Sequence, residues 1–216
     1  MNAKKSIILL SGGLDSATTL YYAKDKGYNC YVLIFDYGQR HKREIKSAVE
    51  IARQLKVPYQ IVKIVLPWKG SALTDASVKI PIERTLSQIS KDIPATYVPG
   101  RNTIFLSFAL SYAEAIGAKF IFIGANVIDY SGYPDCRPQF LEAFQRLIKK
   151  GARDTEIAIK APLIRKTKLQ ILKMAMKLGV PIDKTWSCYS GGETPCGVCD
   201  SCLIRNKAFS IMKKKV

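Results

Sequence analysis

Short apolar runs alternate with longer segments of mixed character along most of this chain. The runs have the length of buried strands and are bounded by turn residues; they cover residues 6–10, 30–36, 59–65 and 119–124. The segments between them have the length and periodicity of helices and cover about 15–27, 41–56, 102–117 and 138–150. Strands that alternate with helices in this way predict an α/β fold with a doubly wound parallel sheet.

The pattern changes near residue 165. A further helix is predicted at about 166–178, because apolar residues recur there at helical spacing and Gly179 and Pro181 follow as stop signals. The rest of the chain is dominated by cysteines and glycines rather than by an apolar core. We therefore expect two parts, an α/β domain at 1–165 and a small C-terminal part at 166–216 with the last helix and a four-cysteine element.

A proline-rich connection interrupts the alternation between the third and fourth strands. Residues 67–99 carry Pro67, Pro81, Pro94 and Pro99 with serines and threonines between them. A long irregular connection inside a compact domain is usually a binding loop or is disordered. We favour a loop that faces the substrate.

Composition is typical of a globular protein without a membrane anchor. The chain has 216 residues, of which 48% are hydrophobic, and no apolar run approaches the ~18 residues that a membrane span needs. The first residues are basic, but the apolar stretch after them is too short for a signal peptide and runs into a glycine turn. These features predict a cytoplasmic protein.

The net charge of +17 suggests an anionic ligand. Such a charge attracts nucleic acids and polyanionic small molecules, and it is also found on proteins with spare surface lysines. The basic residues are dispersed, and no basic stripe interleaved with aromatic residues is present. Nucleic acid is therefore disfavoured as the main ligand.

The first predicted strand leads into the turn Ser-Gly-Gly-Leu-Asp-Ser at residues 11–16, directly before a helix. Free backbone N–H groups and the helix dipole make such a turn an anion site. Adjacent glycines allow a phosphate to approach the backbone, and Ser11 and Ser16 add hydroxyl donors. Asp15 could hold Mg²⁺ beside the phosphates. The turn predicts a nucleotide site.

Four cysteines near the C-terminus have the spacing of metal ligands. They follow the pattern Cys-x7-Cys-x2-Cys-x2-Cys at Cys188, Cys196, Cys199 and Cys202. Two-residue spacings let thiolates turn onto one tetrahedral ion, and disulfides are rare in the cytoplasm. We favour a closed, structural zinc site over an iron–sulfur cluster or redox thiols. Cys30 and Cys136 are expected to be packed thiols.

Three further places combine polar side chains with the end or start of a predicted element. His41, the only histidine, stands three residues before Glu44, so the two are expected to share a helix face, where His41 either transfers protons or has a structural role. Arg101 lies at a helix start, where it suits a phosphate or carboxylate. The loop at 124–137 follows a strand, and a carboxylate such as Asp135 could accept both N–H groups of a guanine-like edge.

These segments together resemble the PP-loop (N-type ATP pyrophosphatase) superfamily. Its members carry Ser-Gly-Gly-x-Asp-Ser, here at residues 11–16. A narrower resemblance, to the 7-cyano-7-deazaguanine synthase family, covers nearly the whole chain in order. It rests on residues 36–41, 98–102, 130–137, 185–189 and 196–205.

The resemblance implies a ligase that converts 7-carboxy-7-deazaguanine, ammonia and ATP into the 7-nitrile, on the route to the tRNA bases queuosine or archaeosine. The carboxylate is expected to attack the α-phosphate of ATP, ammonia then gives an amide, and a second activation dehydrates the amide. The implied cofactors are ATP, Mg²⁺ and structural Zn²⁺, and the implied assembly is a homodimer.

The resemblance also implies residue roles. ATP is expected to bind at Leu9, Leu10, Ser11, Gly12, Gly13, Leu14, Asp15, Ser16, Ala17, Thr18 and Thr19. Catalytic roles are expected for Asp15, Arg101, Lys168 and His41. Substrate contacts are expected from Tyr37, Gln39, Asn102, Tyr133, Asp135 and Arg137.

Two alternatives remain open from the sequence. Another PP-loop adenylating enzyme, such as a tRNA thiolase, would need a catalytic cysteine pair outside the zinc set, for which only Cys30 and Cys136 are left. A basic zinc module that grips nucleic acid backbone would show salt-sensitive RNA binding and no ATP turnover.

Overall fold

A five-stranded parallel sheet forms the centre of the computed structural model, which describes residues 4–89, 92–127 and 132–213. The strand order is β3-β2-β1-β4-β5, and every pairing is parallel. The strands are β1 (Lys5–Leu9), β2 (Asn29–Asp36), β3 (Tyr59–Lys63), β4 (Phe120–Phe122) and β5 (Ala158–Lys160). The predicted α/β fold class is confirmed, and β5 is a strand that the sequence pattern did not predict.

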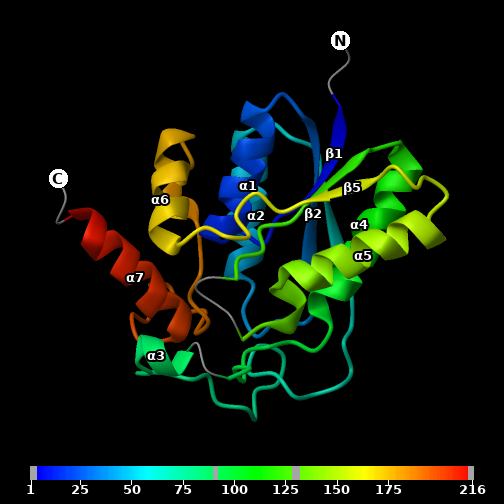
Figure 1. The fold of residues 1–216 in the computed structure, drawn as a ribbon. Coiled ribbons are helices and arrows are strands. Elements are labelled where there is room, and N and C mark those ends of the chain that lie inside the picture. The colour runs from blue at the N-terminus through cyan, green and yellow to red at the C-terminus, as the bar shows by residue number, and fades with distance from the viewer. Residues whose placement is uncertain (1–3, 90–91, 128–131, 214–216) are drawn as a thin grey trace.

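Helices cover both faces of the sheet (Figure 1). The helices that pack on the sheet are α1 (Leu14–Asp25), α2 (Arg43–Gln54), α4 (Arg101–Ile116), α5 (Pro138–Gly151) and α6 (Lys168–Lys177). On one face α1, α2 and α6 share a hydrophobic cluster with β1 and β2, and on the other face α4 and α5 share a second cluster with the same strands. The sheet is therefore doubly wound.

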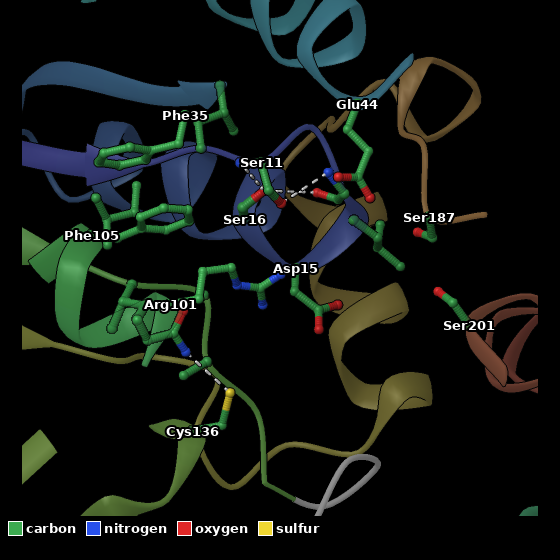
Figure 2. Close-up of a pocket in the computed structure, with 18 of the residues that line it drawn as sticks. Ser11, Asp15, Ser16, Phe35, Glu44, Arg101, Phe105, Cys136, Ser187 and Ser201 are labelled. Atoms are coloured by element: carbon green, nitrogen blue, oxygen red, sulfur yellow. Dashed lines mark hydrogen bonds between the residues drawn. The ribbon is translucent and has the colours of Figure 1, made fainter. Parts of the chain in front are cut away.

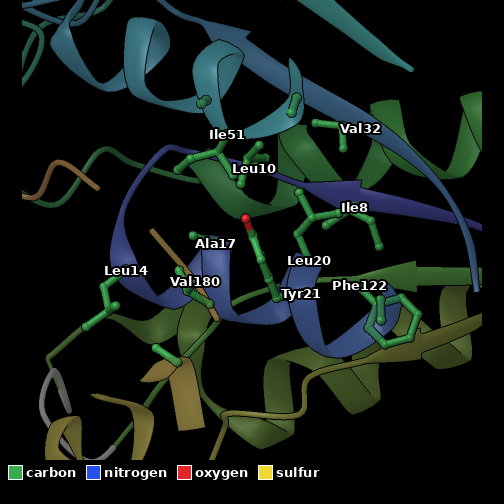
Figure 3. Packing of buried hydrophobic residues seen from close by; sticks show 14 of the residues in the cluster. Ile8, Leu10, Leu14, Ala17, Leu20, Tyr21, Val32, Ile51, Phe122 and Val180 are labelled. Atoms are coloured by element: carbon green, nitrogen blue, oxygen red, sulfur yellow. The ribbon is translucent and has the colours of Figure 1, made fainter. Parts of the chain in front are cut away.

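The first cluster shows why the residues beside the glycine turn hold their positions. Ile8 and Leu10 belong to one cluster with Leu20 of α1 and Ile51 of α2, each at most 2% exposed (Figure 3). Burial of each such side chain contributes about 1.5–3 kcal/mol to folding. The turn between β1 and α1 is thereby anchored at both ends.

The strand order places a crevice at the end of β1. The chain passes from β1 to β2 on one side and returns to β4 on the other, so the order reverses at β1. In open α/β sheets, ligands bind at this switch point, beyond the carboxyl ends of the strands.

The C-terminal part packs against the sheet domain and against the proline-rich connection. It contains α6, the short helix η2 (Ile182–Lys184) and α7 (Asp200–Lys213), and α7 lies beside α3 (Leu86–Ile89) of the connection (Figure 1). Ile171 and Leu172 of α6 and Ala208 of α7 belong to the same cluster as α1. The division at residue 165 stays a prediction.

One local expectation, the place of His41, differs from the structure. Helix α2 begins at Arg43, so His41 precedes it and does not share a helix face with Glu44. Within residues 67–99, Leu73 reaches the central cavity, while other parts of the connection pair with the C-terminal part. Tyr130 and Ser131, in the loop that resembles the synthase family, lie outside the described residues.

None of the helices in the described ranges has the length and apolar character that a bilayer crossing requires.

Candidate active site

A cavity of about 250 Å³ lies at the carboxyl ends of β1, β2 and β4 (Figure 2). Its wall carries two carboxylates, from Asp15 and Glu44, and two cationic side chains, from Arg101 and Lys168. Aromatic rings of Phe35, Tyr37, Phe105, Tyr133, Trp186 and Tyr189 also line it. A site that combines cations, carboxylates and flat rings suits an aromatic, anionic ligand.

Many of the predicted site residues meet on this wall. Those that line it are Leu9, Leu10, Ser11, Gly13, Leu14, Asp15, Ser16, Tyr37, Gln39, Arg101, Asn102, Tyr133 and Lys168. The predicted residues that do not line it are Gly12, Ala17, Thr18, Thr19, His41, Asp135 and Arg137.

The turn after β1 leaves the start of α1 open to a ligand. The hydroxyls of Ser11 and Ser16 lie 3.0 Å apart, and Ser16 donates to the Gly13 carbonyl at 3.1 Å. Gly13 is the N-cap of α1 and supplies no side-chain cap, so the N–H groups of the first turn have no capping side chain. An anion can take that place.

Two glycines allow backbones to meet at this turn. Gly12 has a φ of +85°, and a Cβ there would collide with the Glu44 carbonyl and lie 2.8 Å from the Ala48 nitrogen, both on α2. A Cβ at Gly124, just after β4, would lie 2.9 Å from the Ser16 nitrogen. The absence of a side chain at both positions therefore lets α2 and the end of β4 pack directly against the turn.

Helix α6 brings a cation to the carboxylate of α1. Lys168 Nζ lies 2.7 Å from both carboxylate oxygens of Asp15, and the two side chains are 13% and 23% exposed. Lys168 is the first residue of α6, which begins with a capping box formed by Thr167 and Gln170. The capping box fixes where the lysine enters the cavity.

Arg101 enters the cavity from the first turn of α4. Its Nη1 donates to the Tyr37 hydroxyl at 3.4 Å, and its guanidinium lies 5.9 Å from the Tyr37 ring centre and 6.0 Å from that of Phe105. Burial opposes the charge, but the Tyr37 and Tyr133 phenols more than offset this and raise the pKa of Arg101. The guanidinium is therefore a permanent cation on the wall.

The predicted substrate loop supports α4 rather than facing the cavity throughout. An Asp135 carboxylate oxygen accepts the Asn102 backbone N–H at 3.1 Å, and the Asn102 side chain donates to the Asp135 carbonyl at 3.0 Å. Asp135 thus caps α4 beneath the wall, and Arg137 is exposed. Burial raises the pKa of Cys136 to about 12, which fits a packed thiol and not a nucleophile.

The other predicted residues have local roles. Gln39 accepts the Tyr37 N–H at 2.8 Å and donates to the Phe35 carbonyl at 3.1 Å, so it shapes the turn after β2. Thr18 and Thr19 donate their hydroxyls back into α1. His41 lies against Gly191 of the cysteine element, and burial lowers the pKa of its imidazole.

The wall also holds residues to which the sequence analysis gave no role. Ser187, Tyr189, Trp186 and Ser201 come from the cysteine element, and Glu44 comes from the first turn of α2. Residues 185–189 are one of the segments that carry the family resemblance, but the sequence analysis assigned no function to them. Glu44 had been considered only as a partner for His41.

Glu44 is a desolvated carboxylate. Burial raises its pKa from 4.5 to about 7, and the positive charge of Arg101 only partly opposes this. At neutral pH this side chain can therefore both hold and release a proton.

We expect Glu44→Gln to stabilise the protein above neutral pH. The folded-state pKa lies above the ordinary value, so the folded state binds the proton more tightly and loses stability as pH rises from 4.5 to about 7. Glutamine avoids this penalty, which is roughly 3 kcal/mol at most. Urea unfolding at about pH 5 and about pH 8 checks it. The matched control is Glu50→Gln on the exposed side of α2; an equal effect of Glu44→Gln at both pH values would contradict the prediction.

The four C-terminal cysteines form a cluster of the predicted composition. The sulfur atoms of Cys188, Cys196, Cys199 and Cys202 all lie within 4.8 Å of one another. Backbone N–H groups of Ser190 and Cys196 point at Cys188 Sγ, at 3.4 and 3.3 Å, which favours a thiolate. Four sulfurs at this separation fit a tetrahedral zinc ion with no open coordination position.

The cysteine element is joined to both the glycine turn and the proline-rich connection. The backbone N–H of Trp186 donates to the Gly12 carbonyl at 2.9 Å, and the Ser47 hydroxyl donates to the same oxygen at 2.9 Å. Arg84 of the connection forms a bidentate ion pair with Asp200, which is 1% exposed. These contacts join the cysteine element to one wall of the cavity.

The chain matches relatives over nearly its whole length. The family described as "Queuosine biosynthesis protein QueC" matches residues 5–213. A protein named 7-cyano-7-deazaguanine synthase from Trichodesmium erythraeum is 54% identical, over 95% of each chain. One of the same name from Thermoplasma acidophilum is 53% identical, over 97% of this chain and 89% of its own.

Solved structures of lower identity share the fold. A 4-thiouridine synthetase, solved in complex with RNA and bound ATP, aligns with a TM-score of 0.52 at 18% identity, over 96% of this chain and 53% of its own. An NMN synthetase from Francisella tularensis aligns with a TM-score of 0.50 at 15% identity, over 99% and 87%. At such identities the likeness concerns the fold alone. The family match over residues 5–213 and the relatives above half identity show that this chain belongs to the QueC family of queuosine biosynthesis proteins.

Proposed function

We propose that the protein converts 7-carboxy-7-deazaguanine and ammonia into 7-cyano-7-deazaguanine at the expense of ATP. The observation that carries the proposal is the 54% identity, over 95% of the chain, to a protein that bears the synthase name. The cavity supports it, because its wall combines an open helix N-terminus, two cations and stacked aromatic residues.

The chemistry explains why ATP is needed. A carboxylate is a poor electrophile, so one of its oxygens must first become a leaving group. Attack of the carboxylate on the α-phosphate gives an acyl-adenylate and pyrophosphate; ammonia then forms the amide and releases AMP. A second activation at the amide oxygen, followed by loss of AMP, gives the nitrile. The protein is thus a C–N bond-forming ligase.

The residues that surround the turn have the charges that this reaction needs. The N-terminus of α1 with residues 9–19 binds ATP and its pyrophosphate, and Lys168 and Arg101 offset the phosphate charge. Asp15 holds the Mg²⁺ that accompanies ATP, which fits a carboxylate beside an anion site. Magnesium supplies charge neutralisation of the phosphates.

Deazaguanine contacts are proposed for the predicted substrate residues on the wall. Tyr37, Tyr133, Gln39 and Asn102 lie around the Arg101 side of the cavity, where an aromatic bicycle can stack. Asp135 acts on the site through Asn102, whose backbone and side chain it binds. A catalytic role for His41 has less support, since its ring packs on the cysteine element.

The zinc ion is proposed to be structural, held by Cys188, Cys196, Cys199 and Cys202. A closed four-thiolate site has no position for substrate, and its contribution is to the folding of the C-terminal part. The partners are small molecules rather than nucleic acid, and the assembly is a cytoplasmic homodimer.

Asp15→Ala is expected to remove ATP-dependent turnover while the protein stays folded. The substitution takes away the carboxylate proposed to hold magnesium and frees Lys168 from its ion pair. We expect the activity to fall by roughly 10²-fold or more, because the phosphates lose their positioning. Turnover and circular dichroism of Asp15→Ala check it, with Asp25→Ala at the exposed end of α1 as the control. Turnover of Asp15→Ala at the wild-type rate would exclude the role.

One incubation separates the proposal from its rivals. Protein is mixed with 7-carboxy-7-deazaguanine, ammonium and Mg-ATP, and the nitrile is sought by mass spectrometry. The synthase forms nitrile, a thiolase forms none, and a nucleic-acid module shows salt-sensitive RNA binding without ATP turnover. Absence of nitrile from folded, zinc-loaded protein would overturn the proposal.

A further inference from the structure

Glu44 presents a carboxylate to the cavity without a local partner. It lies in the first turn of α2, and Figure 2 shows its side chain on the same side of the cavity as Ser11 and Ser16. Among the described residues, no hydrogen bond or ion pair reaches its carboxylate oxygens. Asp15, the other carboxylate of the wall, is instead held by Lys168.

The surroundings of Glu44 bring its pKa close to neutral pH. Desolvation raises its pKa to about 7, and Arg101, across the cavity on α4, acts in the opposite direction. The other titratable or charged side chains on the wall are Asp15, Tyr37, Tyr133, Cys136, Lys168 and Tyr189. Among the described wall residues the two carboxylates are Asp15, which is paired with Lys168, and Glu44, which has no ion-pair partner.

The proposed reaction has a proton that must be removed. Amines with a pKa of about 10.4, such as lysine, are protonated at neutral pH. Ammonia is likewise present there mostly as ammonium. Only the neutral molecule has a lone pair for attack on the acyl carbon. A base with a pKa close to the working pH is the most effective acceptor.

We propose that Glu44 is the general base that accepts a proton from ammonium in the amide-forming step. This inference rests on the proposed function. An O–H bond forms on Glu44 as an N–H bond of ammonium breaks, which gives ammonia. The ammonia lone pair forms the C–N bond, the acyl C–O bond breaks, and its electron pair leaves with AMP. The surplus proton on nitrogen then passes to solvent.

A second role for such a carboxylate is to bind the magnesium that accompanies ATP. The two roles differ in the step they affect. A magnesium ligand is needed to activate the acid, whatever nucleophile follows, whereas a base for ammonium is needed only when the nucleophile arrives protonated. Hydroxylamine is largely unprotonated near neutral pH, so it can trap the activated acid as a hydroxamate without that base.

The test compares Glu44→Gln with wild type using both nucleophiles. At limiting ammonium we expect kcat/KM for ammonium to fall by roughly 10²- to 10⁴-fold, because the base is lost. Hydroxamate formation and pyrophosphate release with hydroxylamine are expected to stay within about threefold of wild type. Glu50→Gln, on the exposed side of α2, serves as the control and should keep both rates.

The pH profile gives an independent readout. For wild type, kcat/KM per total ammonium should rise with pH and level off near 7, where Glu44 has lost its proton. In Glu44→Gln the rise should continue until ammonium itself deprotonates. A structural role for Glu44 would change the size of kcat/KM and leave the shape of its profile intact.

Three results would overturn the proposal. These are an unchanged ammonium rate in Glu44→Gln, an equal loss with both nucleophiles, and recovery of the ammonium rate by added Mg²⁺. Failure of the proposed function is distinguished from these, because wild-type protein would then give neither nitrile nor hydroxamate.

Discussion

Replacement of Gly12 by alanine is expected to remove nearly all ATP-dependent activity and to destabilise the fold. The added Cβ would collide with the Glu44 carbonyl and approach the Ala48 nitrogen to 2.8 Å, and both atoms belong to the backbone of α2. The φ of +85° adds strain for any residue with a Cβ. Together we expect a loss of ~3 kcal/mol or more in unfolding free energy.

The loss of activity follows from the same collision. Gly12 can only accept a Cβ if the turn or α2 moves, which displaces the N-terminus of α1 and the Glu44 side chain together. A misplacement of about 1 Å at a reacting site can cost roughly 10²-fold in rate. The measurements are kcat/KM for ATP and urea unfolding of the same preparation.

Gly27 provides a matched control for the Gly12 variant. It follows α1 with a φ of +76°, and a Cβ there meets no atom within 4 Å. Gly27→Ala therefore has a similar backbone strain without the collision, and should lose only ~1 kcal/mol and no activity. If Gly12→Ala and Gly27→Ala lowered the activity and the unfolding free energy equally, the collision of Gly12 with α2 would not be the cause.

Loss of one cysteine ligand is expected to release the C-terminal part and open the ATP site. Cys202→Ser removes a buried sulfur of the four-cysteine cluster that is proposed to bind zinc, and apparent zinc binding energies in small domains are about 10–16 kcal/mol. Without the cluster, nothing fixes the backbone N–H of Trp186 against the Gly12 carbonyl. The same loss would displace the wall side chains of Ser187, Tyr189 and Ser201. We expect a lower Tm, faster proteolysis after residue 180, and loss of activity.

Cys30→Ala is the control for the cysteine variant. Cys30 is 1% exposed in β2 and lies outside the cluster, so its loss leaves a small cavity and no missing ligand. Metal analysis should give about one zinc per wild-type or Cys30→Ala chain and far less in Cys202→Ser. Full activity in wild-type protein that holds well below one zinc per chain would contradict the structural role proposed for zinc.

The parts of the fold that depend on short stretches of sequence could be predicted from the sequence alone. The apolar run before Ser11 and the double glycine at Gly12 and Gly13 predicted β1, the turn and the start of α1 without tertiary information. The spacing of Cys188, Cys196, Cys199 and Cys202 likewise predicted that the four sulfurs would meet.

The residues that were missed depend on packing between distant segments. The strand β5 at Ala158–Lys160 has only three residues, too few for a periodic pattern, and is defined by its pairing with β4. Glu44 was named from the sequence only as a neighbour of His41, because the close approach at Gly12, which brings the first turn of α2 to the cavity, is a tertiary contact. Asp135 was assigned to substrate because a loop sequence does not reveal that its carboxylate caps α4.

The position of Ser187 and Ser201 on the wall could not be read from the sequence for the same reason. They stand next to Cys188 and Cys202, and only the packing of the cysteine element against the sheet domain turns them toward the cavity. Leu73 of the proline-rich connection reaches the cavity, while the ion pair between Arg84 and Asp200 ties another part of the connection to that element.

The central claim is that one cavity activates a carboxylate with ATP and then aminates it to a nitrile. The most direct measurement is a single reaction with ¹⁸O-labelled 7-carboxy-7-deazaguanine, ¹⁵N-ammonium and Mg-ATP, analysed by mass spectrometry. We expect the ¹⁵N label in the nitrile and ¹⁸O in AMP, because the carboxylate oxygen is transferred to the α-phosphate. Nitrile absent from folded, zinc-loaded protein, or AMP without ¹⁸O beside labelled nitrile, would contradict the account.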